Sequence, residues 1–167
     1  MSKLKSIIVD IDGTLSNPNH RQKYIDKPEP TQEDWLMFFN TSDKDTPNEW
    51  CTEIVKNFSN VGYEIIYLTG RPEKIRGITD IWIRKNVPNV PFHLFMRQDK
   101  DRRHDTDIKT QIYKEDIEPI FKVLFTIDDR RSVVEMWREL GLTCLHCADW
   151  SDEHERKAQL ILENDRG

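Results

Sequence analysis

The feature that most constrains the fold is a short apolar run that ends in two carboxylates and a glycine, in the segment 6–15. Its isoleucines and valine predict a short strand that is buried on both faces. Gly13 lets the chain turn away, so Asp10 and Asp12 are expected at the carboxyl edge of a sheet, where open α/β sheets bind ligands. Asp and Gly are also common turn residues, so this pair alone fits a turn as well as a reaction site.

Apolar patterns along the rest of the chain alternate between strand and helix. Four further strands are predicted, at 63–68, 91–96, 123–127 and 142–147. Amphipathic patterns predict helices at 46–60, 72–86, 108–117, 133–140 and 152–164. Strands that alternate with helices imply a parallel sheet with helices on both faces. The expected fold class is therefore α/β, a Rossmann-like three-layer fold around a mainly parallel five-stranded sheet.

The segment 16–45 interrupts this alternation. It is polar and proline-containing, and only residues 35–39 suggest a short helical turn or two. A long excursion of this kind is typical of a lid or binding loop, although a plain surface excursion also fits. Its Trp35, Phe38 and Phe39 could stack on a base, but a tight aromatic cluster is more often core, which favours packing. Thr46-Pro47-Asn48-Glu49 then predicts a capping box, with proline at the first helical position.

Length and composition narrow the class of protein. The 167 residues suit one domain over 1–167, and the net charge of -5 argues against a broadly basic, phosphate-coating surface. The three cysteines give no disulfide framework, and Cys144 to Cys147 reads as a strand without the second ligand pair of a zinc site. No apolar stretch is long enough for a membrane span. We expect a soluble, cytoplasmic protein.

Reactive side chains recur where three predicted strands end: Asp10 and Asp12, Thr69 and Arg71, and Asp128 and Asp129. These ends share one edge of a parallel sheet, so residues far apart in the sequence should converge there. Carboxylates brought so close together would repel one another unless a cation neutralised them, and hard oxygen ligands favour Mg²⁺. The alternative is three unrelated turns that happen to contain Asp.

A magnesium site lined by carboxylates suits phosphoryl transfer, in which positioning and charge neutralisation supply most of the catalysis. A carboxylate can attack phosphorus and form an aspartyl-phosphate, which splits hydrolysis into two steps. Asp10 lies nearest the strand and is the expected nucleophile. Asp12 is expected to protonate the leaving oxygen and later to activate water.

At this level of detail the chain resembles the phosphatases of the haloacid dehalogenase (HAD) superfamily. Residues 10–14 resemble the first motif of that superfamily, and Thr69, Lys109 and the pair Asp128-Asp129 resemble the other three, in the same order. The resemblance implies that Thr69 and Lys109 hold the phosphoryl oxygens. It also implies that Mg²⁺ is bound by Asp10, the Asp12 carbonyl and Asp128, with Asp129 supporting the site.

A closer resemblance, from Ser6 to about Trp150, is to the phosphatase domain of bacteriophage-type polynucleotide kinase/phosphatase. The segments that carry it are 69–71, 97–109 and 127–138. It implies removal of a 3′-phosphate from a nucleic-acid end or nucleotide. The further positions that it assigns to the substrate site are Arg21, Gly70, Arg71, Arg97 and Asp105. Guanidinium groups suit bidentate phosphate contacts, whereas Asp105 more plausibly orients Lys109 or an arginine.

Three functions therefore remain open. The leading one is a Mg²⁺-dependent 3′-phosphatase whose partner is a phosphorylated nucleotide or nucleic-acid end, with no membrane involved. A mononucleotide nucleotidase, acting on 5′- or 3′-phosphates, is the nearest alternative, and the acidic net charge mildly favours it. A catalytically silent protein that binds nucleic-acid ends is the third. No GxxxxGK[ST] stretch is present, so no kinase domain and no phosphorylation of 5′ ends are expected.

Overall fold

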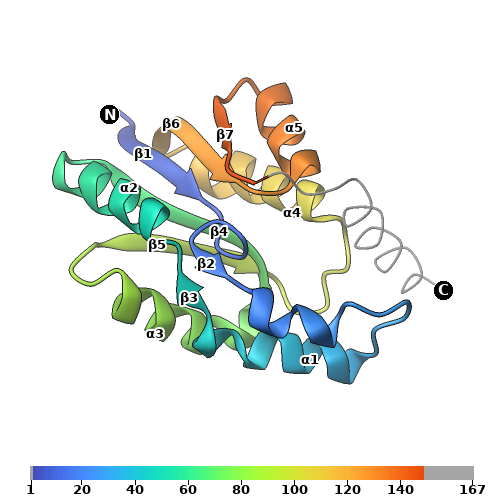
Figure 1. Ribbon diagram of the computed structural model, residues 1–167. Coiled ribbons are helices and arrows are strands. Elements are labelled where there is room, and N and C mark those ends of the chain that lie inside the picture. The colour runs from blue at the N-terminus through green and yellow to red at the C-terminus, as the bar shows by residue number, and fades with distance from the viewer. Residues whose placement is uncertain (1, 149–167) are drawn as a thin grey trace.

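Five parallel strands form the central sheet of the computed structural model, which describes residues 2–148 (Figure 1). In sequence order the strands are β1 (Leu4–Val9), β4 (Glu64–Pro72), β5 (Phe92–Arg97), β6 (Phe121–Asp128) and β7 (Cys144–His146). Their spatial order is β5-β4-β1-β6-β7. All four neighbouring pairs are parallel. The predicted α/β class and the parallel five-stranded sheet are confirmed.

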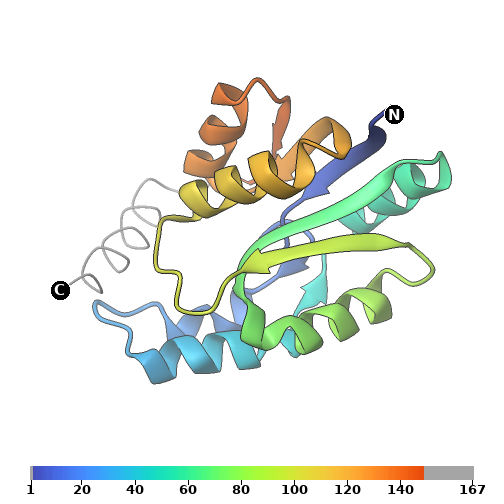
Figure 2. The same cartoon turned by 180° about the vertical axis from the view of Figure 1, so that it is seen from behind.

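Helices cover both faces of this sheet. The first face carries α2 (Glu49–Asn60) and α3 (Arg76–Asn86), and the second carries α4 (Asp105–Ile112) and α5 (Arg131–Glu139). Figure 2 shows α4 and α5 together on one side of the strands and α2 and α3 on the other. A π-helical turn, Tyr113–Ile117, continues α4. The fold therefore has the three layers that the alternation of strands and helices predicts.

The central strand β1 contributes to the hydrophobic core on both faces. Ile7 and Val9 pack with α2 and α3, whereas Ile8 packs with α5 and the end of α4. This division follows from the alternation of side chains along a strand. Because β1 is buried from Ser6 onwards, its carboxyl end delivers Asp10 to a fixed place at the edge of the sheet.

The excursion at 16–45 is more structured than the sequence pattern suggests. It contains β2 (Ser16–Asn17), a 3₁₀ helix at Asn19–Tyr24, α1 (Gln32–Asn40) and a second 3₁₀ helix at Ser42–Lys44. A capping box between Thr31 and Asp34 begins α1. The aromatic rings of Trp35, Phe38 and Phe39 pack against one another, with centroids 5.4–5.9 Å apart. Phe38 is buried, so the cluster packs this excursion, as the sequence favoured.

Two predicted helix starts are wrong. Thr46 and Pro47 form β3, which pairs antiparallel with β2, so the two ends of the excursion lie side by side and α2 begins only at Glu49. The N-cap of α2 is Asn48, and its side chain makes no capping bond. Pro72 is the last residue of β4, and α3 follows a 3₁₀ turn at Glu73–Ile75. In both places pairing with a neighbouring strand holds the proline extended.

Two other expectations concern a C-terminal helix and the absence of a membrane-spanning segment. The helix predicted at 152–164 lies outside the described residues. Within residues 2–148, none of the helices combines the length and the apolar character that crossing a membrane requires.

A buried isoleucine of β4 provides a test of the core. Ile66 is 0% exposed, and Ile66→Ala should lower the free energy of unfolding by about 2–5 kcal/mol, because it removes buried methylenes and leaves a cavity. Ile81 is 69% exposed on α3, and Ile81→Ala should change the same quantity by no more than about 0.5 kcal/mol. Urea unfolding of both variants measures the difference. Equal effects would contradict the assignment of β4 to the centre of the core.

Candidate active site

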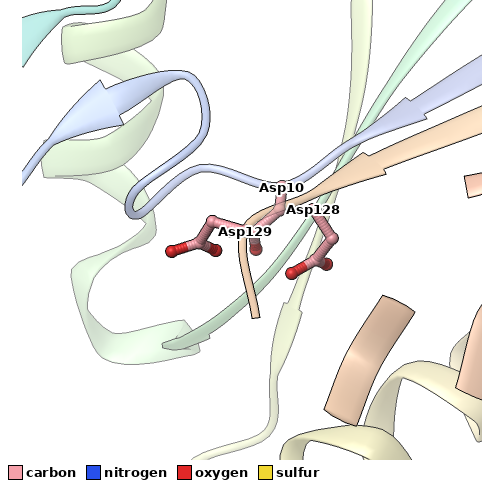
Figure 3. Close-up of side chains that lie close together, drawn as sticks. All are labelled: Asp10, Asp128 and Asp129. Carbon is pink, nitrogen blue, oxygen red and sulfur yellow. The ribbon is translucent and has the colours of Figure 1, made fainter. Parts of the chain in front are cut away.

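Three carboxylates converge where β1 and β6 end. Asp10 follows β1, Asp128 is the last residue of β6, and Asp129 comes next. Each offers an oxygen atom, and these oxygens all lie within 4.8 Å of one another. All three residues are buried, and Figure 3 shows them at the ends of the two adjacent strands. The convergence predicted from the strand ends is therefore present in the fold.

Lys109 on α4 is the cation that lies among these acids. Its Nζ donates to Asp10 Oδ1 at 2.9 Å and to Asp128 Oδ2 at 2.8 Å. It also lies 3.5 Å from Asp105 Oδ2, one turn earlier on the same helix. Burial by itself lowers the pKa of Lys109, but the three carboxylates outweigh it and hold that pKa well above its usual value. Lys109 is therefore charged at the centre of the site.

One lysine does not balance the acids at this edge. Burial raises the pKa of Asp10 well above its usual value, against the opposing effect of Lys109, and Asp128 and Asp129 raise it further. Burial, and next the charge of Asp128, raise the pKa of Asp129 to about 7. Burial is the first cause of both shifts, and repulsion among the three carboxylates adds to it. The donor set consists of hard carboxylate oxygens, so it fits an oxygen-seeking divalent cation such as Mg²⁺.

Asp12 has different partners from Asp10. Its carboxylate accepts hydrogen bonds from Arg71 Nε at 3.0 Å, from the Arg71 NH2 group at 2.6 Å and from Arg21. Burial raises the pKa of Asp12, but Arg71 and Arg21 outweigh it and hold that pKa far below its usual value. Within the described residues, the Asp12 carboxylate is not part of the acidic cluster. As a metal ligand, Asp12 is thus limited to its main-chain carbonyl.

Arg21 and Arg71 also bind Asp45, a residue that the sequence did not reveal. This carboxylate is fully buried and accepts from Arg21 Nε at 2.7 Å and from Arg71 NH2 at 3.1 Å. It also accepts from Ser16 Oγ at 3.0 Å and lies 2.8 Å from His20 Nε2. Asp45 follows a polar excursion and belongs to no recognisable motif, so no local signal marks it. Its importance depends on contacts between residues 24 and 26 positions apart.

Arg97 mainly holds main-chain groups. Its guanidinium donates to the carbonyls of Gly70 at 3.0 Å, Asp101 at 3.0 Å and Arg103 at 2.8 Å, and to Asp105 Oδ1 at 3.4 Å. The loop between β5 and α4 is thereby tied to the end of β4. These bonds favour a structural part for Arg97 over direct contact with substrate.

Thr69 and Gly70 lie next to this loop at the end of β4. The Thr69 hydroxyl is buried and accepts from the Arg71 main-chain N–H at 3.2 Å. A Cβ atom at Gly70 would lie 2.6 Å from Asp105 Oδ1, so the close approach of these two segments requires glycine. The predicted substrate residues Gly70, Arg97 and Asp105 therefore lie together, and Asp105 connects them to Lys109.

Arg130 is a second residue that the sequence analysis missed. Its side chain is 41% exposed, whereas those of Arg97, Arg21 and Arg71 are 14%, 0% and 0% exposed. Its NH1 group lies 3.8 Å from Asp105 Oδ2. Burial lowers the pKa of Arg130, but nearby carboxylates, first Asp105, raise it overall. Its place directly after the acidic pair was the signal that could have identified it.

Comparison with known proteins now decides the family. A family model described as the polynucleotide kinase PNKP phosphatase domain matches residues 4–151. The chain belongs to this PNKP phosphatase family. A curated relative from Autographa californica nuclear polyhedrosis virus, described as a bifunctional polynucleotide kinase/RNA ligase, is 26% identical over 148 residues. That match covers 87% of this chain and 20% of the relative.

Solved structures agree with the PNKP phosphatase assignment. A chain of a Pnkp1/Rnl/Hen1 RNA repair complex is 33% identical, with a TM-score of 0.76 over 90% of this chain and 45% of that one. A class C acid phosphatase from Bacillus anthracis shares the fold, with a TM-score of 0.64 over 99% of this chain and 80% of that one, at 12% identity. The chain thus spans less than half of its repair-complex relative. It is a HAD-fold phosphatase domain, as the motif resemblance predicted.

Gly13 offers a test of how tightly the acidic cluster is packed. Its φ is +85°, and a Cβ atom there would overlap the Asp129 carboxylate. Gly13→Ala should therefore lower kcat/KM for phosphate release by about 100-fold or more, because the clash displaces a cluster residue. Gly62 has a similar φ of +87°, but an added Cβ atom there would have no neighbour within 4 Å. Gly62→Ala should therefore cost only the backbone strain of a positive φ, about 1–2 kcal/mol of stability, without a clash. Similar activity in the two variants would contradict this packing.

Proposed function

We propose that this PNKP phosphatase domain is a Mg²⁺-dependent phosphomonoesterase that removes 3′-phosphates from nucleic-acid ends or nucleotides through an aspartyl-phosphate. The observation that carries the proposal is the Asp10 carboxylate, buried at the sheet edge between Lys109 and two further acids. A carboxylate held beside a lysine and a cation site is arranged to attack an electron-poor phosphorus. The family match supports the phosphate-ester substrate.

The residues that would hold Mg²⁺ are Asp10, Asp128 and Asp129, through their carboxylates, and Asp12 through its carbonyl. The ion would neutralise the phosphoryl oxygens and the cluster together, which is the charge stabilisation that phosphoryl transfer needs. In this proposal Thr69 and Lys109 hold the remaining phosphoryl oxygens. Thr69 lies near the carboxyl end of β4, the strand next to β1, and the ammonium of Lys109 already bonds Asp10.

Asp12 carries the proton in both half-reactions. It protonates the leaving oxygen when Asp10 attacks, and it then activates the water that hydrolyses the aspartyl-phosphate. The two arginines favour the ionised form of Asp12, which is the form that activates water. The first half-reaction needs the protonated form. We therefore expect the substrate phosphate to draw an arginine away from Asp12 before the leaving oxygen is protonated.

Two observations favour a nucleic-acid end as substrate. The 33% identical structural relative belongs to an RNA repair complex, and the viral relative is described as a polynucleotide kinase/RNA ligase. Arg130 supplies the most exposed guanidinium among the four arginines at the site, so it is placed to bind a phosphate of the substrate. The predicted substrate arginines, Arg21 and Arg71, are buried against Asp12, so in this proposal their part is limited to the scissile phosphate. The net charge of -5 keeps a mononucleotide as the second candidate.

Phosphate release from defined substrates tests this function. Wild-type protein with Mg²⁺ should release phosphate from 3′-phosphorylated oligonucleotides faster than from 5′-phosphorylated ones. Asp10→Asn should slow release by about 1,000-fold or more, because it removes the nucleophile. Asp116→Asn changes an exposed acid in the same way and should leave the rate unaltered. Absence of release from every substrate, or full activity in Asp10→Asn, would reject the proposal.

Salt dependence separates the two substrate candidates. If the protein binds a strand, activity on oligonucleotides should fall steeply with salt, while activity on 3′-mononucleotides should not. Equal salt dependence for both would favour the mononucleotide.

The pH dependence of Mg²⁺ binding tests the metal site without a reaction. Because the pKa of Asp129 is about 7, protons compete with the cation below neutral pH. The Mg²⁺ affinity should therefore rise from about pH 6 to about pH 8, by up to about tenfold per unit below the pKa. Calorimetric titration measures it, and the dependence should weaken in Asp129→Asn. A flat wild-type profile would contradict a role for this carboxylate in cation binding.

A further inference from the structure

Asn48 uses its side chain in an unexpected way. It is the N-cap of α2, a position at which an asparagine side chain usually accepts a hydrogen bond from the first turn of the helix. Here it makes no such bond. Its Nδ2 instead donates to the carbonyl of Thr14 at 2.8 Å and to that of Ser16 at 3.5 Å. The Asn48 amide therefore bonds the turn after Asp12 and does not cap its own helix.

The main chain of Asn48 completes the contact. Its N–H donates to the carbonyl of Leu15 at 2.8 Å. Three consecutive carbonyls of the turn, those of Thr14, Leu15 and Ser16, therefore accept hydrogen bonds from one residue. The three residues are buried, so their carbonyls have little access to water as an alternative partner. The Asn48 side chain donates to two main-chain carbonyl oxygens, so the NH₂ end of its amide must face them.

The same turn fixes the two reactive acids. The Gly13 N–H donates to the Ser16 carbonyl at 2.9 Å, and the Leu15 N–H donates to the Asp10 carbonyl at 3.3 Å. A shift of the Thr14 to Ser16 carbonyls would therefore move Gly13 and the main chain of Asp10. The Asp12 carbonyl lies between these two points in the chain. Cys147, the residue after β7, adds a weak contact to this turn, from its Sγ to the Gly13 carbonyl at 4.0 Å.

We propose that Asn48 is a positioning residue for the reaction: it holds the turn 13–16 from outside, so that Asp10 and the Asp12 carbonyl keep the geometry needed for attack. This inference rests on the proposed phosphatase function, because it assigns Asn48 to that site. Within residues 2–148, no hydrogen bond or ion pair joins Asn48 to the acidic cluster or to Arg21 and Arg71, so it acts through the turn. It also ties the start of α2 and the end of the excursion to the first motif.

Two substitutions separate positioning from helix capping. Ser and Asp cap helices about as well as Asn, but Ser is too short to reach the turn and Asp cannot donate. In Asn48→Ser and Asn48→Asp, kcat should fall by about 100-fold. KM should change by less than about threefold. The melting temperature should stay within about 5 °C of wild type. Asn57→Ser is the matched control, because the Asn57 amide donates only to Glu53 of its own helix.

Amide hydrogen exchange gives a readout that does not depend on activity. The amides of Gly13 to Ser16 should exchange at least about tenfold faster in Asn48→Ser than in wild type, with no change in Asn57→Ser. Unchanged exchange in the turn, or a loss of kcat that only follows a large loss of melting temperature in both Asn48 variants, would overturn the proposal. An inactive wild type whose turn still loosens in Asn48→Ser would instead reject the proposed function.

Discussion

The rest of the structure depends on the pairing of buried charges at one edge of the sheet. The fold buries Asp10, Asp128 and Asp129 within a few ångströms of one another and supplies Lys109 as the cation in contact with two of them. Such a cluster is costly to bury unless its charges are paired. The position of α4, and the loop that Arg97 ties to Gly70, bring Lys109 to this point. With one ammonium against three carboxylates, the edge fits a divalent cation.

A second group of buried charges is balanced within the protein. Asp12 and Asp45 are two acids, and Arg21 and Arg71 are two bases that each contact both of them. Arg21 comes from the excursion at 16–45, Arg71 from β4, and Asp45 from the end of the excursion, just before β3. The Arg21 guanidinium also lies over the Phe38 ring at 4.2 Å and donates to the Phe38 carbonyl. These contacts explain how a polar excursion can pack firmly against the first motif.

Local patterns predicted most of the fold and the convergence of several acids at one edge of the sheet. The strands and the acids at their ends depend on residues that are adjacent in sequence, so hydrophobic periodicity and motif spacing reveal them. The capping box predicted at 46–49 was wrong for two reasons. Pairing with β2 holds Thr46 and Pro47 extended, and the Asn48 amide donates to the Thr14 carbonyl. Both partners lie about 30 residues away, so the local pattern does not reveal them. Asp45 was missed for the same reason. Its significance lies in two distant arginines that only the folded chain brings together.

The contrast between the two groups of charges bears on how a proton can reach Asp12. Arg21 and Arg71 stabilise the carboxylate, so Asp12 stays ionised as long as both contacts persist. Of the groups that take part in the proposed reaction, the phosphate is the one that offers a guanidinium bidentate acceptors comparable to a carboxylate. Its arrival would weaken the hold on Asp12 and raise the pKa of that carboxyl when a proton donor is needed. Departure of the phosphate would restore the ionised form, which links protonation of Asp12 to occupancy of the site.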